Sequence, residues 1–445
     1  MATFHVENFG CRATQADGAA LERQFRERGL ERAVDQACAE VVVLNTCTVT
    51  ASADRDARAA IRRIHRQNPQ CRIVVTGCYA QRAPQEIAAL PGVSEVIGNS
   101  HKHQLVEIVL PQAASPAAEP DRFSASAGVF VSDIFAHTQL LAAPVFEAAN
   151  ERTRPILKVQ DGCDNRCSFC VIPQVRGNSR SLPLAEVIDQ VHRLVASGYR
   201  EVVISGINLG RWGLDLTSSG TRQARFEHLV QAILNDTDLE KLRISSVEPM
   251  DWSDHLIRLM AESPRIARHA HVPMQSGSDR ILRLMHRKYR PWHYREKIEK
   301  IRAAIPAAAI GADVMVGFPG ETEADFEKTF RLVEELPFTY LHVFTYSARP
   351  RTRAASLNNQ VPPQVAHERN RALRELTGEK HQKFLQSFVG RIVEAITLNI
   401  ANAEHTECVT DNYLRLTLHG AHPPNRWQNV LVERASSTQL FGVLA

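Results

Sequence analysis

The sequence predicts an α/β protein in three parts: an N-terminal doubly wound parallel sheet, a central partial barrel of six β/α units, and a small C-terminal all-β domain. Three observations predict this fold class. Short apolar segments alternate with helical patterns at the start of the chain and again from about residue 154. A segment rich in Pro, Ala and Ser separates the two series. After residue 385 strand-like segments replace the alternation.

The N-terminal series contains four apolar segments typical of parallel strands, and polar helical patterns follow the first three. The segments read FHVENFG, EVVVLNT, RIVVTG and SEVIGN. The first helix is expected over roughly Gln15 to Arg28. We therefore place an N-terminal domain at residues 1–110 and a linker at residues 111–152, where Pro, Ala and Ser dominate.

The second series supplies six candidate strands, and helical patterns separate most of them. They read PILKVQDG, EVVISGINLG, KLRISSVEP, RHAHVPMQSG, IGADVMVGFPG and YLHVFTYSA. Six units are too few for a closed eight-unit barrel, so we expect an open barrel at residues 153–385, ending in a long helix. Alternating segments in residues 386–445 predict the small β domain.

The composition is that of an ordinary globular protein, with 44% hydrophobic and 23% charged residues. There is no run of 18 apolar residues and no signal-peptide pattern, so we expect a cytoplasmic protein without a membrane segment. The net charge of +4 does not by itself indicate a nucleic-acid partner. Residues 280–302 carry nine basic and two acidic residues, which fits either a solvated helix face or a phosphate-contacting surface.

Nine cysteines in such a chain favour metal binding or catalysis over disulfides. Cys163, Cys167 and Cys170 form a C-x3-C-x2-C motif just beyond the first strand of the second series, where parallel α/β folds place their active sites. A [4Fe–4S] cluster held by three thiolates leaves one iron open to a small molecule. A zinc site completed by a distant ligand and a redox-active dithiol are the alternatives.

Three further cysteines, Cys11, Cys47 and Cys78, each follow one of the first three strands of the N-terminal series. Because the carboxyl ends of parallel strands lie at one edge of a sheet, we expect the three thiols to lie close together at that edge. We interpret them as ligands of a second [4Fe–4S] cluster, with a cluster completed by another ligand or a zinc site as alternatives. Cys38 and Cys71 lie near strand starts and are expected to be incidental thiols.

Five other strand-end residues are candidates for cofactor binding, and no side chain is assigned as catalytic. Gly206 either allows a ligand to approach the backbone or is needed only for the turn after its strand. Ser246 and Glu248 alternate, so they share one face of a strand end. Gln275 and Gly317 lie at the ends of later strands.

In these motifs the chain resembles the radical S-adenosylmethionine methylthiotransferases. The matching motifs are, in order, NFGCRATQAD, LNTCTVT, TGCYAQ, DGCDNRCSFCVIPQVRGNSRS, SSVEP, HVPMQSGSDRILRLMHRKY and VGFPGETEADF. The resemblance implies two [4Fe–4S] clusters, S-adenosylmethionine on the open iron of the first, and a sulfur on the second. It also implies a C-terminal TRAM-type domain and insertion of a methylthio group at an unactivated C–H, with Ser246 and Glu248 near the ribose or the methionine ammonium.

Members of this family modify either tRNA adenosines beside the anticodon or an aspartate of a ribosomal protein. QDGC and the basic residue in GCRATQ are similar to the members acting at C2 of N6-threonylcarbamoyladenosine at position 37 of tRNA. The isopentenyladenosine and ribosomal-protein types are the alternatives, and Thr14 departs from the asparagine expected there. Arg349, Arg351 and Arg353 are candidate contacts for phosphate or the threonyl carboxylate, or else plain surface charge.

The partners that the resemblance implies are tRNA, a reductant of the flavodoxin or ferredoxin type, and a sulfur donor. We expect a monomer. A competing class is an iron–sulfur or zinc RNA-binding protein without catalysis, which would leave the strand-end residues of the barrel without a role.

Overall fold

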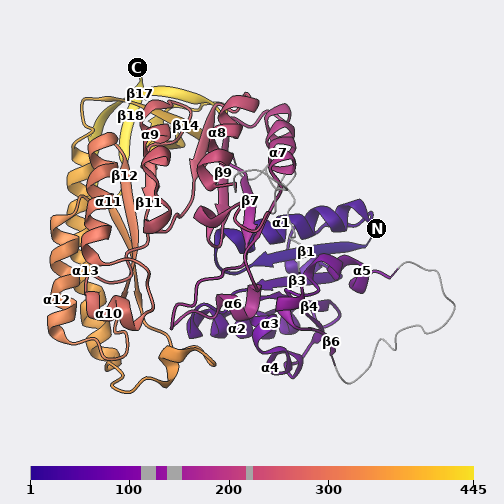
Figure 1. Cartoon of the computed structure of the whole chain (residues 1–445). Coiled ribbons are helices and arrows are strands. Elements are labelled where there is room, and N and C mark those ends of the chain that lie inside the picture. Colours follow the sequence, from indigo (N-terminus) through magenta and orange to yellow (C-terminus); the bar gives the residue numbers. More distant parts are fainter. Residues whose placement is uncertain (1, 112–126, 138–152, 217–223) are drawn as a thin grey trace.

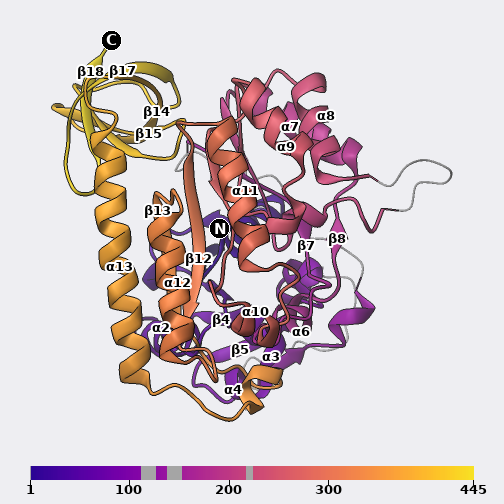
Figure 2. The same ribbon diagram turned by 60° about the vertical axis from the view of Figure 1, so that its left-hand side comes forward.

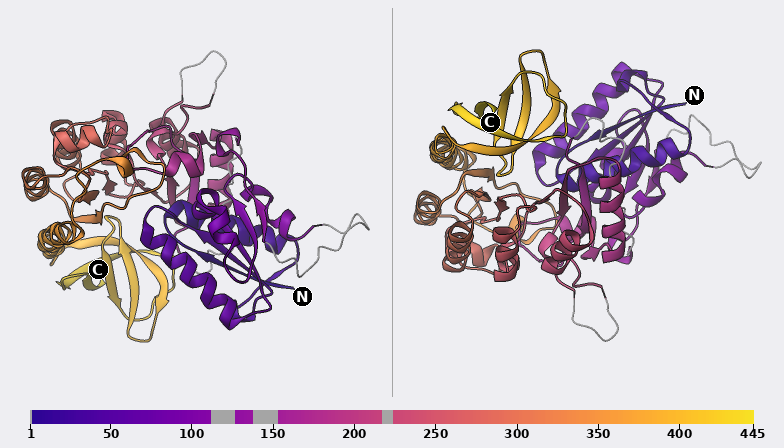
Figure 3. Two further views of the ribbon diagram at one scale, coloured as in Figure 1. Left: turned by 90° about the horizontal axis from the view of Figure 1, so that it is seen from below. Right: turned by 90° about the horizontal axis from the view of Figure 1, so that it is seen from above.

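The computed structural model describes residues 2–111, 127–137, 153–216 and 224–445. The chain forms an N-terminal parallel sheet, a central open barrel and a C-terminal closed β-barrel, which confirms the predicted fold class (Figure 1). In both views of Figure 3 the N-terminal sheet and the C-terminal barrel lie side by side against the central part. Within the described ranges, no helix has the length and apolar character needed to cross a membrane.

The N-terminal sheet has six parallel strands in the order β2-β1-β3-β4-β5-β6. The strands are β1 (Thr3–Asn8), β2 (Glu31–Arg32), β3 (Val41–Thr46), β4 (Arg72–Gly77), β5 (Val93–Gly98) and β6 (Gly128–Phe130). One face packs against α1 (Arg12–Glu27) and α5 (Leu105–Val109), and the other against α2 (Ala51–Gln67), α3 (Cys78–Arg82) and α4 (Pro84–Ala88). Because alternate strand residues point to opposite faces, the sheet is buried on both sides and doubly wound.

The N-terminal part differs from expectation in two places. The helix α1 begins at Arg12 rather than near Gln15, with Cys11 as its N-cap residue. The strand β6 lies inside the segment expected to be a linker and pairs with β5. Residues 112–126 and 138–152 of that segment lie outside the described residues.

The central part contains six parallel strands that curve into an open barrel. They are β7 (Ile156–Asp161), β9 (Glu201–Gly206), β10 (Lys241–Ile244), β11 (His269–His271), β12 (Ala309–Val316) and β13 (Tyr340–Thr345). Parallel bridges between Leu242 and Ile266 and between Ser246 and His271 join β10 to the β11 side. A short antiparallel strand, β8 (Arg180–Ser181), pairs with the end of β7.

Helices cover the outer face of this barrel and form the largest apolar core with it. They are α7 (Leu184–Ala196), α8 (Phe226–Asp236), α9 (Asp254–Glu262), α11 (Pro291–Ala304) and α12 (Glu323–Glu335). Two short helices, α6 (Ile172–Arg176) and α10 (Asp279–Leu284), lie near the carboxyl ends of the strands. The predicted long helix is α13 (Pro363–Gln386), which runs beside α12 to the C-terminal barrel (Figure 2).

The C-terminal part is a closed barrel in the order β14-β15-β16-β18-β17, so it has no free strand edge. Its strands are β14 (Ile392–Ala401), β15 (His405–Thr410), β16 (Arg415–His419), β17 (Trp427–Ala435) and β18 (Leu440–Leu444). The barrel is tied to β10 because Arg243 donates a hydrogen bond of 3.0 Å to the carbonyl oxygen of Asp411.

The N-terminal part covers the open side of the central barrel. At one edge, Ala16 of α1 packs with Ile156 of β7 and Val203 of β9. At the other edge, beyond β13, Ser347 Oγ accepts a 3.0 Å hydrogen bond from the amide of Ala51. The carboxyl edge of the N-terminal sheet therefore borders the barrel interior.

Candidate active site between the sheet and the barrel

The C-x3-C-x2-C motif lies between β7 and α6, at the carboxyl end of the first barrel strand. We call residues 163–170 the cluster loop; it carries Cys163, Cys167 and Cys170. The chain turns into the loop at Gly162, whose φ is +72° and where a Cβ would lie 1.9 Å from the carbonyl oxygen of Asn178. Any larger residue would collide with backbone there, so this glycine sets the direction of the loop.

The centre of the cluster loop is fixed against the other side of the barrel. The amide of Ser168 donates to the carbonyl oxygen of Met285 at 3.1 Å, and its hydroxyl donates to that of Leu284 at 2.7 Å. The carbonyl of Ser168 accepts from the amide of Ala354 at 2.8 Å. Phe169 packs into a small apolar cluster beside these residues. Protein contacts therefore hold the centre of the loop in place.

A buried cation faces the loop thiols. Arg287 donates to Cys167 Sγ at 3.2 Å and forms an ion pair with Glu248. Burial raises the pKa of the Cys170 thiol to about 12 and also raises the pKa of Cys163. Free thiols here would hold their protons at neutral pH, so a metal must displace them. The guanidinium of Arg287 then offsets part of the negative charge of the thiolates.

The donor set fits a [4Fe–4S] cluster with one open iron. Thiolates are the usual ligands of such clusters, and the loop supplies three. Six cysteines lie outside the loop. Cys38 is exposed after β2, Cys71 precedes β4, Cys408 is buried in the C-terminal barrel, and the other three follow strands of the N-terminal sheet. All nine cysteines are free thiols. The cluster loop itself therefore supplies three thiols and no fourth.

The second group of thiols lies at the carboxyl edge of the N-terminal sheet, on the neighbouring strands β1, β3 and β4. Cys11 and Cys47 come from adjacent strand ends, since a Cβ on Gly10 would lie 2.9 Å from Cys47 Sγ. Cys78 Sγ accepts a hydrogen bond of 3.6 Å from Asn99. Burial, with the nearby thiol of Cys78, raises the pKa of Cys47 to about 12. This donor set fits a second cluster with an open iron.

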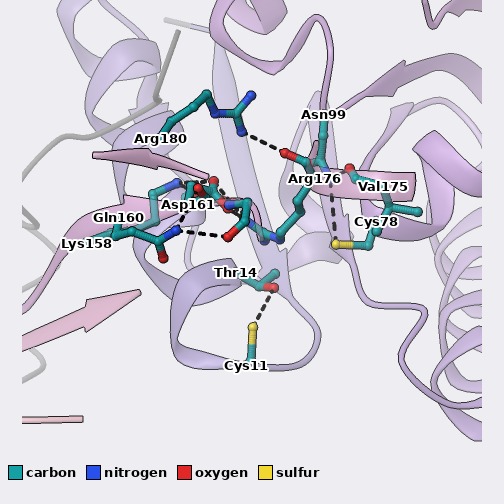
Figure 4. A network of polar contacts seen from close by, with 12 residues as sticks. Cys11, Thr14, Cys78, Asn99, Lys158, Gln160, Asp161, Val175, Arg176 and Arg180 are labelled. Atoms are coloured by element: carbon teal, nitrogen blue, oxygen red, sulfur yellow. Dashed lines mark hydrogen bonds and ion pairs between the residues drawn. The ribbon is translucent and has the colours of Figure 1, made fainter. Parts of the chain in front are cut away.

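Five buried charged residues lie between the two thiol groups, and we call them the buried charge network. Asp17 and Lys102 come from the N-terminal part, and Lys158, Asp161 and Arg176 from the barrel. Arg176 reaches Asp17 at 3.1 Å and Asp161 at 2.9 Å, and Lys102 reaches Asp17 at 3.0 Å. Figure 4 shows Lys158, Asp161 and Arg176 beside Cys11 and Cys78. The network joins the two parts of the chain at the site.

The network has three cations and two carboxylates, so it leaves one positive charge beside the thiols of the N-terminal group. Burial by itself would lower the pKa of Arg176, but the charges of Asp161 and Cys78 outweigh burial and raise that pKa. Sequence reasoning missed this network. The available signal was Lys158, a lysine inside the apolar strand PILKVQD.

Three of the five predicted cofactor residues are less buried than their neighbours in the chain. Ser246, Glu248 and Gln275 are half-buried, while the residues between Ser246 and Glu248 and before Gln275 are buried. Gln275 has a φ of +63°, a costly backbone conformation for a residue other than glycine, and it forms a bridge with Val314. These positions are consistent with ligand contact, which stays a prediction.

The two glycines among the five have a packing explanation of their own. A Cβ on Gly206 would lie 2.9 Å from Oε1 of Gln160. Gly317 has a φ of +74°, and a Cβ there would lie 2.6 Å from the Cβ of Ala366 in α13. Close contacts within the protein therefore account for both glycines, and their role toward a cofactor stays a prediction.

The three predicted substrate arginines are in different surroundings. Arg349 is buried, donates to Thr48 Oγ1 at 2.9 Å and forms an ion pair with Asp54, so it joins the barrel to the loop after Cys47. Arg351 and Arg353 are exposed. The guanidinium of Arg349 is thus engaged within the protein, whereas Arg351 and Arg353 remain available to a partner.

A polar group that sequence reasoning missed lines the barrel interior on β11, β12 and β13. His271, Asp313 and His342 each offer a ligand atom within 4.8 Å of the others. His271 Nε2 lies 3.2 Å from Asp313 Oδ1, and its Nδ1 bonds to the hydroxyl of Tyr340 at 2.9 Å. Burial, helped by the charge of His271, lowers the pKa of His342. The sequence signal for His271 was its alternation with apolar residues in RHAHVP, and His342 has the same setting in YLHVFT.

This open six-stranded barrel, with three thiols after its first strand, defines a radical S-adenosylmethionine enzyme. The family model described as the radical SAM superfamily matches residues 157–333, and one described as uncharacterized protein family UPF0004 matches residues 3–98. The structure is similar to the radical S-adenosylmethionine methyltransferase TsrM from Kitasatospora setae with cobalamin and a [4Fe-4S] cluster bound. The TM-score is 0.58 at 16% identity, covering 80% of this chain and 77% of that chain, which supports the fold.

Two similar relatives are tRNA-modifying enzymes by name. Threonylcarbamoyladenosine tRNA methylthiotransferase MtaB from Aquifex aeolicus (strain VF5) is 36% identical over 96% of this chain and 99% of the relative. tRNA-2-methylthio-N(6)-dimethylallyladenosine synthase from Thermobifida fusca (strain YX) is 35% identical over 88% of this chain and 77% of the relative. The chain belongs to the radical S-adenosylmethionine methylthiotransferase family, whose cofactors are S-adenosylmethionine and [4Fe–4S] clusters.

Proposed function

We propose that this protein adds a methylthio group to C2 of N6-threonylcarbamoyladenosine beside the anticodon of tRNA. One observation carries the proposal: two groups of three thiols come from different parts of the chain and lie close together, because Cys78 of the second group packs against Val171, the residue after Cys170. A single three-thiol site would serve many radical reactions. The second site, at the edge of the N-terminal sheet, favours sulfur transfer, and the named activity of the Aquifex relative favours this substrate.

In this proposal each thiol group holds one cluster. The cluster loop holds the first through Cys163, Cys167 and Cys170, and the N-terminal sheet holds the second through Cys11, Cys47 and Cys78. When bound, the clusters and S-adenosylmethionine supply one-electron chemistry that removes a hydrogen atom from an unactivated carbon and delivers a methylated sulfur to it.

The side chains of the barrel bind and align the reactants. Ser246, Glu248 and Gln275 are half-buried at the carboxyl ends of the barrel strands and are our candidates for contacts with S-adenosylmethionine. An aromatic C–H has no acidity that a side-chain base can use near neutral pH, so a side-chain base cannot remove this hydrogen. The work of the protein is to hold the reacting atoms in line and to exclude water.

The remaining parts of the proposal concern partners. The tRNA would approach in the cytoplasm, with a flavodoxin- or ferredoxin-type reductant and a sulfur donor. The two exposed arginines, Arg351 and Arg353, lie on the chain segment after β13 and are available for phosphate. We infer that the protein acts as a monomer.

The test is turnover on defined RNA. Purified protein with both clusters reconstituted is given anticodon stem-loop RNAs carrying threonylcarbamoyladenosine, isopentenyladenosine or plain adenosine, and the nucleosides are analysed by mass spectrometry. We expect the methylthio product on the first RNA alone. Equal product on the isopentenyl RNA, or product only on a ribosomal protein, would contradict the substrate while leaving the chemistry standing.

A further inference from the structure

A cavity of about 300 Å³ lies where the three parts of the chain meet. The helix α1 contributes Arg12, the segment before β7 contributes Arg154, the strand β10 contributes Arg243, and the C-terminal barrel contributes Tyr413. The cavity therefore exists only when all three parts are assembled. It is separate from the cluster loop, which lies at the carboxyl ends of the barrel strands.

Three guanidinium groups surround the ring of Tyr413. Their Cζ atoms lie 5.2 Å (Arg243), 5.8 Å (Arg12) and 5.8 Å (Arg154) from its centroid. Burial would raise the pKa of the Tyr413 hydroxyl, but the charges of Arg12 and Arg154 outweigh burial and lower it. The backbone of Tyr413 has a φ of +69°, a strained conformation that holds the ring in this position. The lining is thus strongly cationic around one aromatic ring.

The positive charge of this cavity is only partly balanced. Glu201 pairs with Arg243 at 2.5 Å and lies 3.7 Å from Arg154, so one carboxylate serves two arginines. Arg12 donates a 3.1 Å hydrogen bond to the hydroxyl of Tyr413, and in the described part of the chain no carboxylate lies within ion-pair distance of it. A half-buried guanidinium without an acidic partner is a ready site for an anion.

Arg12 also lies next to the proposed site of sulfur transfer. It directly follows Cys11, which we propose as a ligand of the second cluster. Its side chain also lies close to the barrel strands: Tyr413, which accepts the hydrogen bond from Arg12, has its ring centroid 4.7 Å from that of His269 on β11. The cation therefore lies between the N-terminal thiols and the inner face of the barrel.

We infer that Arg12 recognises the carboxylate of the threonylcarbamoyl group and determines specificity for that nucleoside. The inference rests on the proposed function. In the adenine ring, C2 and the carbon that carries N6 both neighbour N1, so the group on N6 and the reacting C2 lie on the same side of the base. When C2 meets sulfur held near Cys11, the threonyl carboxylate falls within reach of the next side chain. A dimethylallyl group offers no anion and would leave Arg12 without a partner.

The test measures kcat/KM on two anticodon stem-loop RNAs that differ in one group. One carries threonylcarbamoyladenosine, and the other carries its carboxamide analogue, which is uncharged and of similar shape. For the unaltered enzyme we expect a preference on the order of 100-fold for the carboxylate. Arg12→Gln should reduce the preference below about 10-fold, and Arg12→Lys should give an intermediate value, because lysine keeps the charge but not the two-pronged donor.

Two controls accompany this measurement. Arg23→Gln removes one positive charge and an exposed ion pair to Glu27 from the same helix, so it should keep the full preference. Iron, sulfide and electron paramagnetic resonance spectra of each variant report whether the cluster beside Cys11 is intact. If Arg12→Gln fails to load that cluster, Arg154→Gln, which lies in the barrel part of the cavity, should still lower the preference.

Each outcome decides a different question. An unchanged preference in Arg12→Gln and Arg154→Gln overturns the inference. An equal loss on every RNA, including one with unmodified adenosine, also overturns it, because the cavity then binds a backbone phosphate. If the unaltered enzyme forms no methylthio product on the threonylcarbamoyl RNA, the proposed function itself has failed.

Discussion

Replacing Asp17 by asparagine should loosen the joint between the N-terminal sheet and the barrel. Asp17 lies on α1 and is 1% exposed. It pairs with Lys102 at 3.0 Å and with Arg176 at 3.1 Å, and it also contacts Lys158. Asparagine keeps the size of the side chain and removes its charge. The variant leaves three buried cations facing the single carboxylate of Asp161.

The structure gives the size of the effect. Removing one partner of a buried ion pair costs about 3–5 kcal/mol, because the other charge stays buried without compensation. Domains are stable by only about 5–15 kcal/mol, so the loss is a large share of the total. Because Lys158 and Arg176 belong to the barrel and Asp17 to the sheet, the contact between the two parts should weaken first. Separate opening of the N-terminal part should precede global unfolding.

The dependence on pH has a defined sign. Burial would raise the pKa of the Asp17 carboxyl, but the charges of Lys102, Lys158 and Arg176 outweigh burial and lower the pKa to about 2. A carboxyl with a lowered pKa stabilises the fold fully above its unfolded value, 3.8, and loses that contribution as the pH falls through about 2. The difference between the unaltered protein and Asp17→Asn should be constant near neutral pH and shrink in that acidic window.

Urea unfolding at pH 7, with hydrogen exchange of α1 and β7, measures this effect. Asp189→Asn is the matched control, since Asp189 is 54% exposed and pairs with Arg193 at 2.8 Å on the surface of α7. An exposed pair of this kind is worth about 0–1 kcal/mol, so the control should behave like the unaltered protein. If Asp17→Asn lies within about 1 kcal/mol of the unaltered protein, the network does not hold the joint.

Three other variants test the site. Cys163→Ala should abolish formation of 5′-deoxyadenosine, whereas Cys38→Ala, at an exposed cysteine outside both thiol groups, should not change it. Cys47→Ala should keep 5′-deoxyadenosine formation, stop methylthio transfer, and reduce bound iron from about eight to about four per chain; full product would show that the second site is misread. Gly162→Ala places a Cβ at a position with φ +72°, where it collides with the backbone of Asn178. The variant should lower the free energy of unfolding by at least about 1–3 kcal/mol, measured by thermal unfolding. It should also bind less iron, measured by iron analysis.

Much of the fold and of the thiol pattern follows from local sequence. Parallel strands put their carboxyl ends at one edge, so cysteines that follow β1, β3 and β4 had to lie together whatever the loop details. The same rule placed the cluster loop after β7. Helix limits were less exact, since α1 begins at Arg12 rather than near Gln15. The strands and the cysteines that follow them are features that short segments of sequence determine.

Contacts between distant segments were not predictable in this way. Asp17 and Lys158 are far apart in sequence, and nothing in either segment shows that the two side chains meet when α1 packs on β7. Arg349 was a candidate for either a substrate contact or surface charge, and its ion pair with Asp54 depends on how the N-terminal part docks beside β13. The glycines at 206 and 317 stay candidates for ligand contact, and their contacts with Gln160 and Ala366 also join segments far apart in sequence. Each of these contacts depends on how distant segments pack together.

The docking itself explains why an open barrel suits this chemistry. A closed eight-stranded barrel fills its interior with side chains, whereas six strands leave one side uncovered. Here the N-terminal sheet covers that side through Ala16 at β7 and β9 and through Ala51 beyond β13. The thiol group of the N-terminal sheet is thereby brought next to the thiol group of the barrel. Hydrogen abstraction and sulfur transfer at one carbon require contact distances of about 3–3.5 Å, so the joint that holds sheet to barrel also sets whether the two reactions can meet at that carbon.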